Sequence, residues 1–211
     1  MKNAFPLDEE KQRLQQLYFY QLQDLRKESV FDSFAKTAAV IAESPIAHVS
    51  LMDESFQSVI SCVGIELDQV DREDTLCKYV VEKKERVLIE DTLLDERSKD
   101  SEILKEAGIR FYLGIPLKDP KGFVLGTLCV LDFKPRALSS EQLSTLSSLG
   151  EATTEMLLTR RSLSHAHYFG ELFRLTNNLI GVLNQDFEIS DPNLLARFPR
   201  TITDPIGVAL L

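Results

Sequence analysis

The segment IRFYLGIPLKDPKGFVLGTLCVLD, residues 109–132, decides the fold. Its two ends, residues 109–117 and 123–132, are rich in the branched and aromatic side chains that are typical of strands. Between them lies the turn-forming stretch DPKG, residues 119–122. The segment therefore predicts two antiparallel strands joined by a tight turn.

A second hairpin is predicted nearer the N-terminus. The runs IAHVSLMD (46–53) and FQSVISCVG (56–64) are both rich in strand-forming residues and are separated by only two residues. Two amphipathic helices precede them, over residues 8–28 and 31–43, and Pro45 ends the second.

The two hairpins are joined by a polar segment, residues 65–108. We expect a loop over 65–74, a helix over 75–84, a short strand at 87–89, an irregular loop over 90–99, and a helix over 101–107 capped by Gly108. Irregular loops of this length in compact domains are often functional. A further helix begins near Ser139 and Ser140, which can cap its first turn.

The order helix, hairpin, helix, hairpin, helix favours an α+β fold over a doubly wound one, because hairpins pair antiparallel and leave few crossover connections. We expect one central antiparallel sheet with helices on both faces.

Charge and composition exclude several classes of protein. The chain has 211 residues, a net charge of −9 and scattered acidic side chains, which disfavours nucleic acid or an anionic membrane as partner. No apolar run is long enough to span a bilayer, and the N-terminus has no secretion signal, so we expect the protein in the cytoplasm.

Cysteine and histidine spacing predicts neither a disulfide framework nor a metal site. The cysteines Cys62, Cys77 and Cys129 are odd in number and widely spaced, and we expect all three to be reduced and metal-free. No histidine lies at a zinc-site spacing from a cysteine. His48 is interpreted as a satisfied strand histidine, and His165 and His167 as residues of a linker helix.

Four motifs, in this order, resemble a GAF domain of the group fused to bacterial sensor kinases and cyclic-dinucleotide enzymes. They are FDSFAKTAAVIAESPIAHVSLMDE (31–54), TLCKYVV (75–81), IRFYLGIPL (109–117) and GTLCVLDFKPRALSSEQ (126–142). The resemblance divides the chain into an N-terminal amphipathic helix (1–28), a GAF domain (29–161), and a helical linker with an incomplete PAS-like segment (162–211).

The resemblance implies a ligand pocket between the sheet and residues 75–108. The candidate ligand-binding residues are Cys77, Tyr79, Asp91, Arg97, Arg110 and Tyr112. Arg110 either pairs with a carboxylate of the protein or awaits an anionic ligand. Phe111 and Tyr112 can instead be core residues, and Asp91 and Arg97 a solvated loop pair. On this hypothesis, residues 75–84 and 90–99 close over the ligand.

Missing chemistry argues against specific cofactors and against catalysis. A bilin needs a cysteine followed by histidine, whereas Lys78 follows Cys77, and His48 is the one candidate haem ligand in the domain. A free methionine-R-sulfoxide reductase needs a thiol pair, and Cys77 is the lone cysteine of the pocket segments. No kinase motif accompanies His165. No cofactor is therefore predicted, and the chain is not expected to be an enzyme.

The resemblance predicts a cytoplasmic sensory module that binds a small ligand, dimerises, or both, and transmits a signal to an adjoining domain, for example in a two-component system. Alternatives are a dimerisation scaffold without a ligand and a reductase-like enzyme. Apolar stripes on the end helices predict a parallel homodimer; they comprise Leu14, Leu17, Leu22, Leu25, Leu146, Leu149, Met156 and Leu163.

Overall fold

A computed structural model describes residues 7–20 and 29–159 of the chain, all of which belong to one compact unit. The predicted linker and PAS-like segment lie outside the described residues, as do the last eight residues (21–28) of the predicted first helix, both linker histidines, and Leu22, Leu25 and Leu163. Among the described residues, no helix has both the length and the apolar character needed to cross a membrane.

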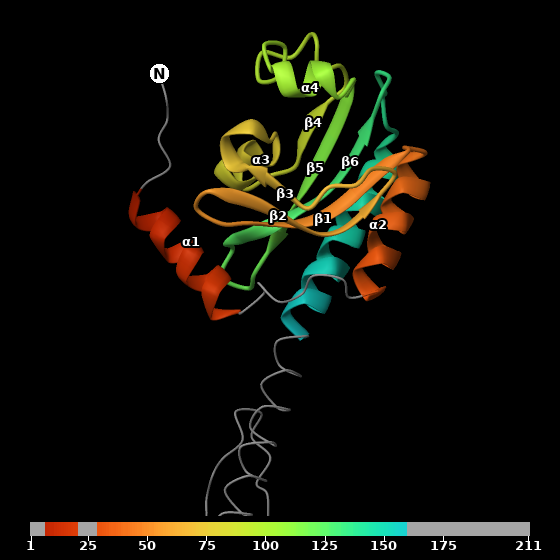
Figure 1. Ribbon diagram of the computed structural model, residues 1–211. Coiled ribbons are helices and arrows are strands. Elements are labelled where there is room, and N and C mark those ends of the chain that lie inside the picture. Colours follow the sequence, from red (N-terminus) through yellow and green to blue (C-terminus); the bar gives the residue numbers. More distant parts are fainter. Residues whose placement is uncertain (1–6, 21–28, 160–211) are drawn as a thin grey trace, which may run out of the picture. The chain divides into compact units, whose positions relative to one another are not determined.

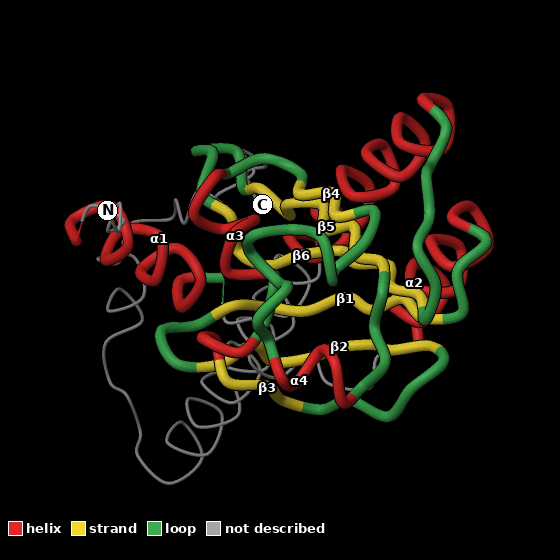
Figure 2. The backbone as a smooth tube through the Cα atoms, turned by 90° about the horizontal axis from the view of Figure 1, so that it is seen from above, coloured by secondary structure: helices red, strands yellow, loops and turns green. Residues whose placement is uncertain are grey.

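The centre of the fold is a six-stranded sheet in the order β3-β2-β1-β6-β5-β4, in which every neighbouring pair is antiparallel. Figure 2 shows this order from above. The strands are β1 (Ile46–Met52), β2 (Phe56–Val63), β3 (Gln69–Asp71), β4 (Val87–Ile89), β5 (Phe111–Lys118) and β6 (Val124–Asp132). Both predicted hairpins are confirmed, since β1 pairs with β2 and β5 pairs with β6.

Helices cover both faces of the sheet, which confirms the predicted α+β class (Figure 1). The helices are α1 (Leu7–Phe19), α2 (Ser29–Ala42), α3 (Cys77–Lys83), α4 (Glu102–Glu106) and an unlabelled helix over residues 140–159. The helix α2 and the helix 140–159 lie on one face, and α3 and α4 lie on the other. These are called the α2 face and the α3 face below.

The segment 65–74, predicted as a loop, contains regular structure. Strand β3 pairs with the start of β2, and a single 3-10 turn, η2 (Arg72–Asp74), follows it. Strand β3 lies at the edge of the sheet and none of its side chains is buried, so it carries no alternating apolar pattern. Its conformation is set by backbone pairing with a distant segment, which local sequence patterns do not report.

The two faces of the sheet have separate cores. Phe111 and Leu113 of β5 pack in the larger core beneath α2 and the helix 140–159. Tyr112, between them in sequence, packs in the smaller core beneath α3. The predicted alternation along this strand is therefore confirmed, because successive side chains of a strand point to opposite faces.

The helix α1 is fixed to the end of the sheet by a buried arginine. The side chain of Arg13 is 1% exposed. Its Nη1 donates to the carbonyl oxygens of Met52 (2.7 Å) and Val124 (3.1 Å), and Nη2 donates to the carboxylate of Glu10 (2.8 Å). A guanidinium can be buried at little cost only when its donors are satisfied in this way.

The apolar stripes assigned to a dimer interface are partly used within the protomer. Leu17 is 3% exposed and Leu146 is 0% exposed, and both belong to the core of the α2 face. The interpretation of these two leucines as interface residues is therefore wrong. The reason is that the helix 140–159 packs beside α2 and covers the sheet more completely than the stripes suggest.

Candidate functional site

The α3 face carries a row of buried polar side chains that crosses four strands. From β2 to β5 the row comprises Gln57, Ser50, Thr127, His48, Cys129 and Tyr112, to which α3 adds Cys77. The pairing of Ser50 with Thr127 and of His48 with Cys129 brings β1 and β6 into register. Because strand side chains alternate, this register places all these groups on one face.

Hydrogen bonds connect the row from β2 to β6. Gln57 Nε2 donates to Ser50 Oγ (2.8 Å), and the hydroxyls of Ser50 and Thr127 are 3.0 Å apart. The thiol of Cys129 donates to Thr127 Oγ1 (3.2 Å). Apart from His48, whose Nδ1 has no hydrogen-bond partner among the described residues, the row is therefore a bonded chain rather than a set of isolated polar groups, as buried polar side chains generally require.

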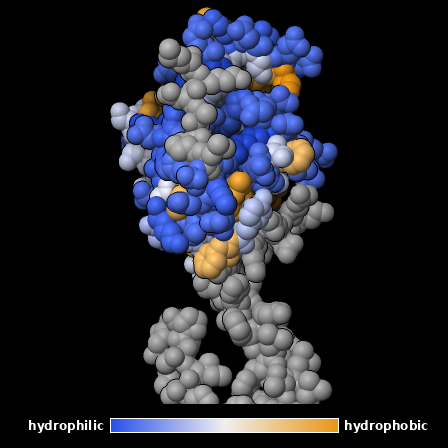
Figure 3. Space-filling model, turned by 90° about the vertical axis from the view of Figure 1, so that its left-hand side faces the viewer, coloured by the Kyte–Doolittle hydropathy of each residue, from blue (hydrophilic) through white to orange (hydrophobic). Residues whose placement is uncertain are grey.

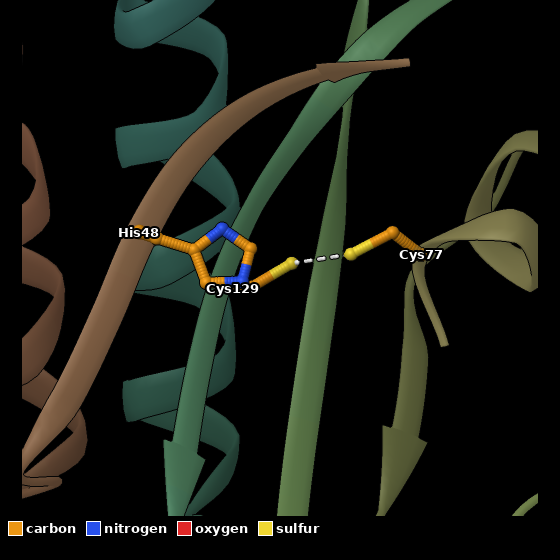
Figure 4. A group of neighbouring side chains, drawn as sticks. All are labelled: His48, Cys77 and Cys129. Atoms are coloured by element: carbon orange, nitrogen blue, oxygen red, sulfur yellow. Dashed lines mark hydrogen bonds between the residues drawn. The ribbon is translucent and has the colours of Figure 1, made fainter. Parts of the chain in front are cut away.

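Two thiols meet at the end of this chain. Cys77 Sγ and Cys129 Sγ are 3.3 Å apart, and the two residues come from α3 and β6 (Figure 4). Tyr112 Oη donates to Cys77 Sγ at 3.3 Å and lies 3.5 Å from Cys129 Sγ. The prediction that Cys77 lacks a thiol partner is therefore wrong. The partner is missed because 52 residues separate the two cysteines.

Local sequence explains the position of Cys77. It is the first residue of α3, and its backbone N–H donates to the hydroxyl of Thr75 (3.2 Å). Val80 and Val81 follow on the same short helix and are fully buried against the sheet. The apolar side of α3 thus fixes the helix, and the thiol is carried into the core with it.

His48 completes a three-residue cluster. One imidazole nitrogen of His48 and the sulfurs of Cys77 and Cys129 all lie within 4.8 Å of one another. His48 Nδ1 is buried and has no hydrogen-bond partner among the described residues. The interpretation of His48 as a satisfied strand histidine is therefore wrong. Spacing rules miss the cluster because its members come from β1, α3 and β6.

Burial and mutual contact change the protonation of this cluster. Burial lowers the pKa of His48, which favours the neutral imidazole. Burial raises the pKa of both buried thiols, but at Cys77 the hydrogen bonds with Cys129, Thr127 and Thr75 oppose burial, and the pKa of Cys77 is lowered. The pKa of Cys129 is raised, so the first proton leaves the pair from Cys77.

Arg110 is paired within the protein. Its Nε and Nη2 donate to the two carboxylate oxygens of Asp91 at 3.0 and 2.6 Å. The hydrogen bonds from Arg110 lower the pKa of Asp91, and those to Asp91 raise the pKa of Arg110. Two alternatives were open for Arg110, a carboxylate of the protein or an anionic ligand. In the structure Arg110 binds a carboxylate of the protein, that of Asp91.

Arg97 and Tyr79 form a third group. Arg97 pairs with Asp95 (2.6 Å) and also donates to the carbonyl oxygen of Leu88 (3.2 Å). Tyr79 Oη donates to the carbonyl oxygen of Arg97 (3.4 Å). Asp91 and Arg97 are thus paired with other residues and not with each other. The loop 90–99 is held by these contacts and by Ser98 Oγ, which donates to the carbonyl oxygen of Thr92 (2.8 Å).

The six predicted site residues therefore form three pairs rather than one cavity lining. Side chains of the smaller core occupy the space between α3 and the sheet. An open surface pocket of about 720 Å³ adjoins the loop 90–99, and Asp91 is the one predicted site residue that lines it. The other residues that line it are Leu88, Glu90, Leu94, Asp95, Pro135, Arg136 and Ala137.

Comparison with known proteins identifies relatives. The chain is 31% identical over 180 residues to a cyclic di-GMP phosphodiesterase of Pseudomonas aeruginosa, an alignment that covers 83% of this chain and 30% of that protein. The chain thus matches less than a third of the length of this relative.

Solved structures share the fold. The GAF domain of an Acinetobacter phosphoenolpyruvate-protein phosphotransferase has a TM-score of 0.53 at 19% identity, covering 81% of this chain and 99% of that one. A type II free methionine-R-sulfoxide reductase of Thermoplasma acidophilum has a TM-score of 0.52 at 16% identity, covering 67% and 93%. The family model described as "GAF domain" matches residues 28–154. On the strength of that match, this chain belongs to the GAF domain family, whose members serve as regulatory modules of sensor and signalling proteins.

Proposed function

We propose that this chain binds a small ligand on the α3 face and passes the resulting change through α1 to an adjoining signalling domain. The observation that carries the proposal is a set of ion pairs between α1 and the elements that cover the α3 face. Glu9 of α1 pairs with Lys84, which follows the last residue of α3. Glu10 of α1 pairs with Arg72 of η2 (2.5 Å).

These ion pairs give a mechanical reason for coupling. Cys77 begins α3 and Lys84 directly follows its last residue, so a shift of this seven-residue helix at the thiol end moves the residue that holds Glu9. Arg13, which pairs with the same Glu10, is anchored in the sheet and provides a fixed point for α1. A ligand that favours one position of α3 therefore favours one position of α1.

The polar row supports ligand binding as the input. A face that serves only to pack a helix is expected to be apolar, because each buried polar group costs free energy unless it is hydrogen-bonded. Here hydroxyl, amide, thiol and phenol groups are retained side by side. They offer donors and acceptors to a small polar ligand that displaces α3.

For the output we propose turnover of cyclic di-GMP, because the matched relative is a phosphodiesterase of that molecule. The test is a chimera in which this chain replaces the matched region of the Pseudomonas protein. Arg72→Gln with Lys84→Gln removes both ion pairs to α1 while leaving its apolar contacts in place. We expect a changed rate of cyclic di-GMP hydrolysis.

A matched control is Lys36→Gln at an exposed position of α2, on the opposite face of the sheet from α3. The chimera that carries it should hydrolyse cyclic di-GMP at the unaltered rate. Equal rates for the unaltered chimera and the double variant, with unchanged circular dichroism, contradict the proposed coupling.

A homodimer is the second candidate, favoured by exposed aromatic side chains on α1. Tyr18 and Phe19 are 48% and 54% exposed, and Leu149 and Met156 are half-buried on the helix 140–159. The surrounding surface on the α1 and α3 side is mostly hydrophilic (Figure 3). A dimer interface on this side would therefore bury only a small apolar area. Light scattering tests this: the double variant Leu149→Glu, Met156→Glu should be monomeric, and a dimer that persists contradicts these helices as the interface.

A further inference from the structure

We infer that His48, Cys77 and Cys129 form a binding site for a thiophilic divalent metal ion, of which Zn²⁺ is the best chemical match. The inference goes beyond the proposed function, because the site can hold a metal whether or not α1 relays a signal. It is carried by the convergence of three ligand atoms within 4.8 Å and by a buried imidazole whose Nδ1 has no partner among the described residues.

The distances suit a small tetrahedral ion. Zinc–sulfur bonds of about 2.3 Å at a tetrahedral angle place two sulfurs roughly 3.7 Å apart, and zinc–nitrogen bonds are about 2.0–2.1 Å. The sulfurs of Cys77 and Cys129 are 3.3 Å apart. An opening of about half an ångström, which a rotation at the first residue of α3 can supply, therefore accommodates the ion.

The ligand types select the metal. Two sulfurs and one imidazole are soft and borderline donors, which favour zinc and related ions over magnesium or calcium. The cluster contains no carboxylate among the described residues. Hard cations, which prefer oxygen ligands, are therefore not expected to bind here.

Charge balance makes the site compatible with its burial. Binding converts the two thiols to thiolates and releases two protons to solvent, so the metal's two positive charges meet two negative charges. With neutral His48 as third ligand, the bound site has no net charge. The cost of burying an unpaired ion is thereby avoided.

The surroundings provide supporting hydrogen bonds. Thr127 Oγ1 contacts Cys129 Sγ at 3.2 Å, and its hydroxyl can donate to the thiolate once the metal is bound. Tyr112 Oη contacts both sulfurs and can donate to them or supply the fourth ligand. Hydrogen bonds of this kind orient metal ligands and tune their basicity. Since the ligands come from β1, β6 and α3, a bound metal ties α3 to the sheet.

Metal titration of the complete chain tests the inference. The protein is reduced with a phosphine, stripped with a chelator and titrated with Zn²⁺ against a chromogenic competitor. We expect one Zn²⁺ per chain, and with Co²⁺ we expect thiolate-to-cobalt charge-transfer absorption. Cys77→Ser and Cys129→Ser should each abolish the stoichiometric site. The matched control is Cys62→Ser, which should retain it, since Cys62 lies outside the cluster.

A second measurement does not depend on the folding of variants. In the wild-type protein, Zn²⁺ should slow alkylation of Cys77 and Cys129 and leave that of Cys62 unchanged, as read by peptide mass spectrometry. Three results overturn the inference: no Zn²⁺ uptake by the reduced chain, uptake that persists in both cysteine variants, or equal alkylation with and without Zn²⁺. A disulfide between Cys77 and Cys129 that resists the phosphine also overturns it.

Discussion

The two faces of the sheet are built from the same strands and differ in chemistry. The α2 face is packed with aliphatic and aromatic side chains from α2, the helix 140–159 and the sheet. The α3 face combines a smaller apolar cluster with hydroxyls and thiols that are hydrogen-bonded to one another. It also contains His48, whose Nδ1 has no partner among the described residues. The comparison indicates that one face supplies most of the stability and the other is free to carry function.

Adjacent residues of single strands make this comparison direct. Each of three strands presents an apolar residue to the α2 face and a polar neighbour to the α3 face. The pairs are Val49 and His48, Phe111 and Tyr112, and Leu128 and Cys129. Substitutions at neighbouring positions therefore probe different cores with the same backbone.

The largest effect is expected at Phe111, which is fully buried in the core of the α2 face. Phe111→Ala should lower the free energy of unfolding by about 3–5 kcal/mol, because it removes a large buried ring and leaves a cavity. Tyr112→Phe, on the α3 face, removes only a hydroxyl and should cost about 1 kcal/mol. Urea unfolding followed by circular dichroism measures both. Equal losses of unfolding free energy in the two variants would contradict the conclusion that the α2 face supplies most of the stability.

Next in size is Arg13, at the edge where α1 meets the sheet. Arg13→Gln should lower the free energy of unfolding by about 2–4 kcal/mol, because the carbonyls of Met52 and Val124 lose a buried donor. The control is Arg86→Gln at an exposed position, with an expected change within about 0.5 kcal/mol. A loss at position 13 no larger than at position 86 would exclude Arg13 as the anchor of α1.

Gly114→Ala sharpens the description of the α3 face. A Cβ atom at this glycine would lie 2.2 Å from Tyr112 Oη and 2.6 Å from a methyl group of Val80. We expect a loss of about 1–3 kcal/mol from overpacking, with Tyr112 displaced from the thiols. Near-ultraviolet circular dichroism and urea unfolding report the two effects. An unperturbed tyrosine signal would show that the position of the Tyr112 phenol does not require a glycine at position 114.

Thr127→Val tests the hydrogen-bonded row itself. The variant removes the hydroxyl that links Ser50 and Cys129, and should cost about 1–2 kcal/mol because both partners lose a buried bond. Thr145→Val on the exposed side of the helix 140–159 is the matched control and should change stability by less than about 0.5 kcal/mol. If the two variants lose the same free energy of unfolding in urea, the hydrogen bonds of the row contribute nothing measurable to stability.

The smallest effect is expected at the ion pair of Asp91 and Arg110, which belongs to neither core. The hydrogen bonds from Arg110 hold the pKa of Asp91 below its ordinary value of 3.8. A depressed folded pKa stabilises the protein above that ordinary value, and the contribution is lost as the pH falls through the folded pKa. Arg110→Gln should raise the pKa of Asp91 toward 3.8, as measured by NMR titration. An unchanged titration would contradict the pairing.

Much of the fold could be predicted from local patterns. The hairpin of β5 and β6 follows from two strand-forming runs around the turn DPKG, and the alternation of Phe111 with Tyr112 assigned them to opposite faces. The strand at β4 was predicted with its bounds, residues 87–89. Each of these features depends on residues close in sequence, whose periodicity records which side is buried.

The site could be predicted only in part. Cys77 and Tyr112 were named from the sequence and do lie together, because both belong to segments that bound the expected pocket. The partner of Arg110 was left open, and the alternative that pairs Arg97 with Asp91 is wrong, since Arg97 pairs with Asp95. An arginine in sequence does not reveal which carboxylate lies within its reach. The prediction that no thiol accompanies Cys77 failed because it counted only the cysteines of neighbouring segments.

By itself, the sequence determined the strands other than β3, the hairpins, the α+β class and the family, because side-chain period and turn chemistry act over a few residues. Tertiary structure alone decided that His48, Cys77 and Cys129 meet, and that Glu9 and Glu10 of α1 reach Lys84 and Arg72. The physical reason is that these contacts depend on strand order and helix docking. Packing of the whole chain fixes both, and no local pattern encodes either.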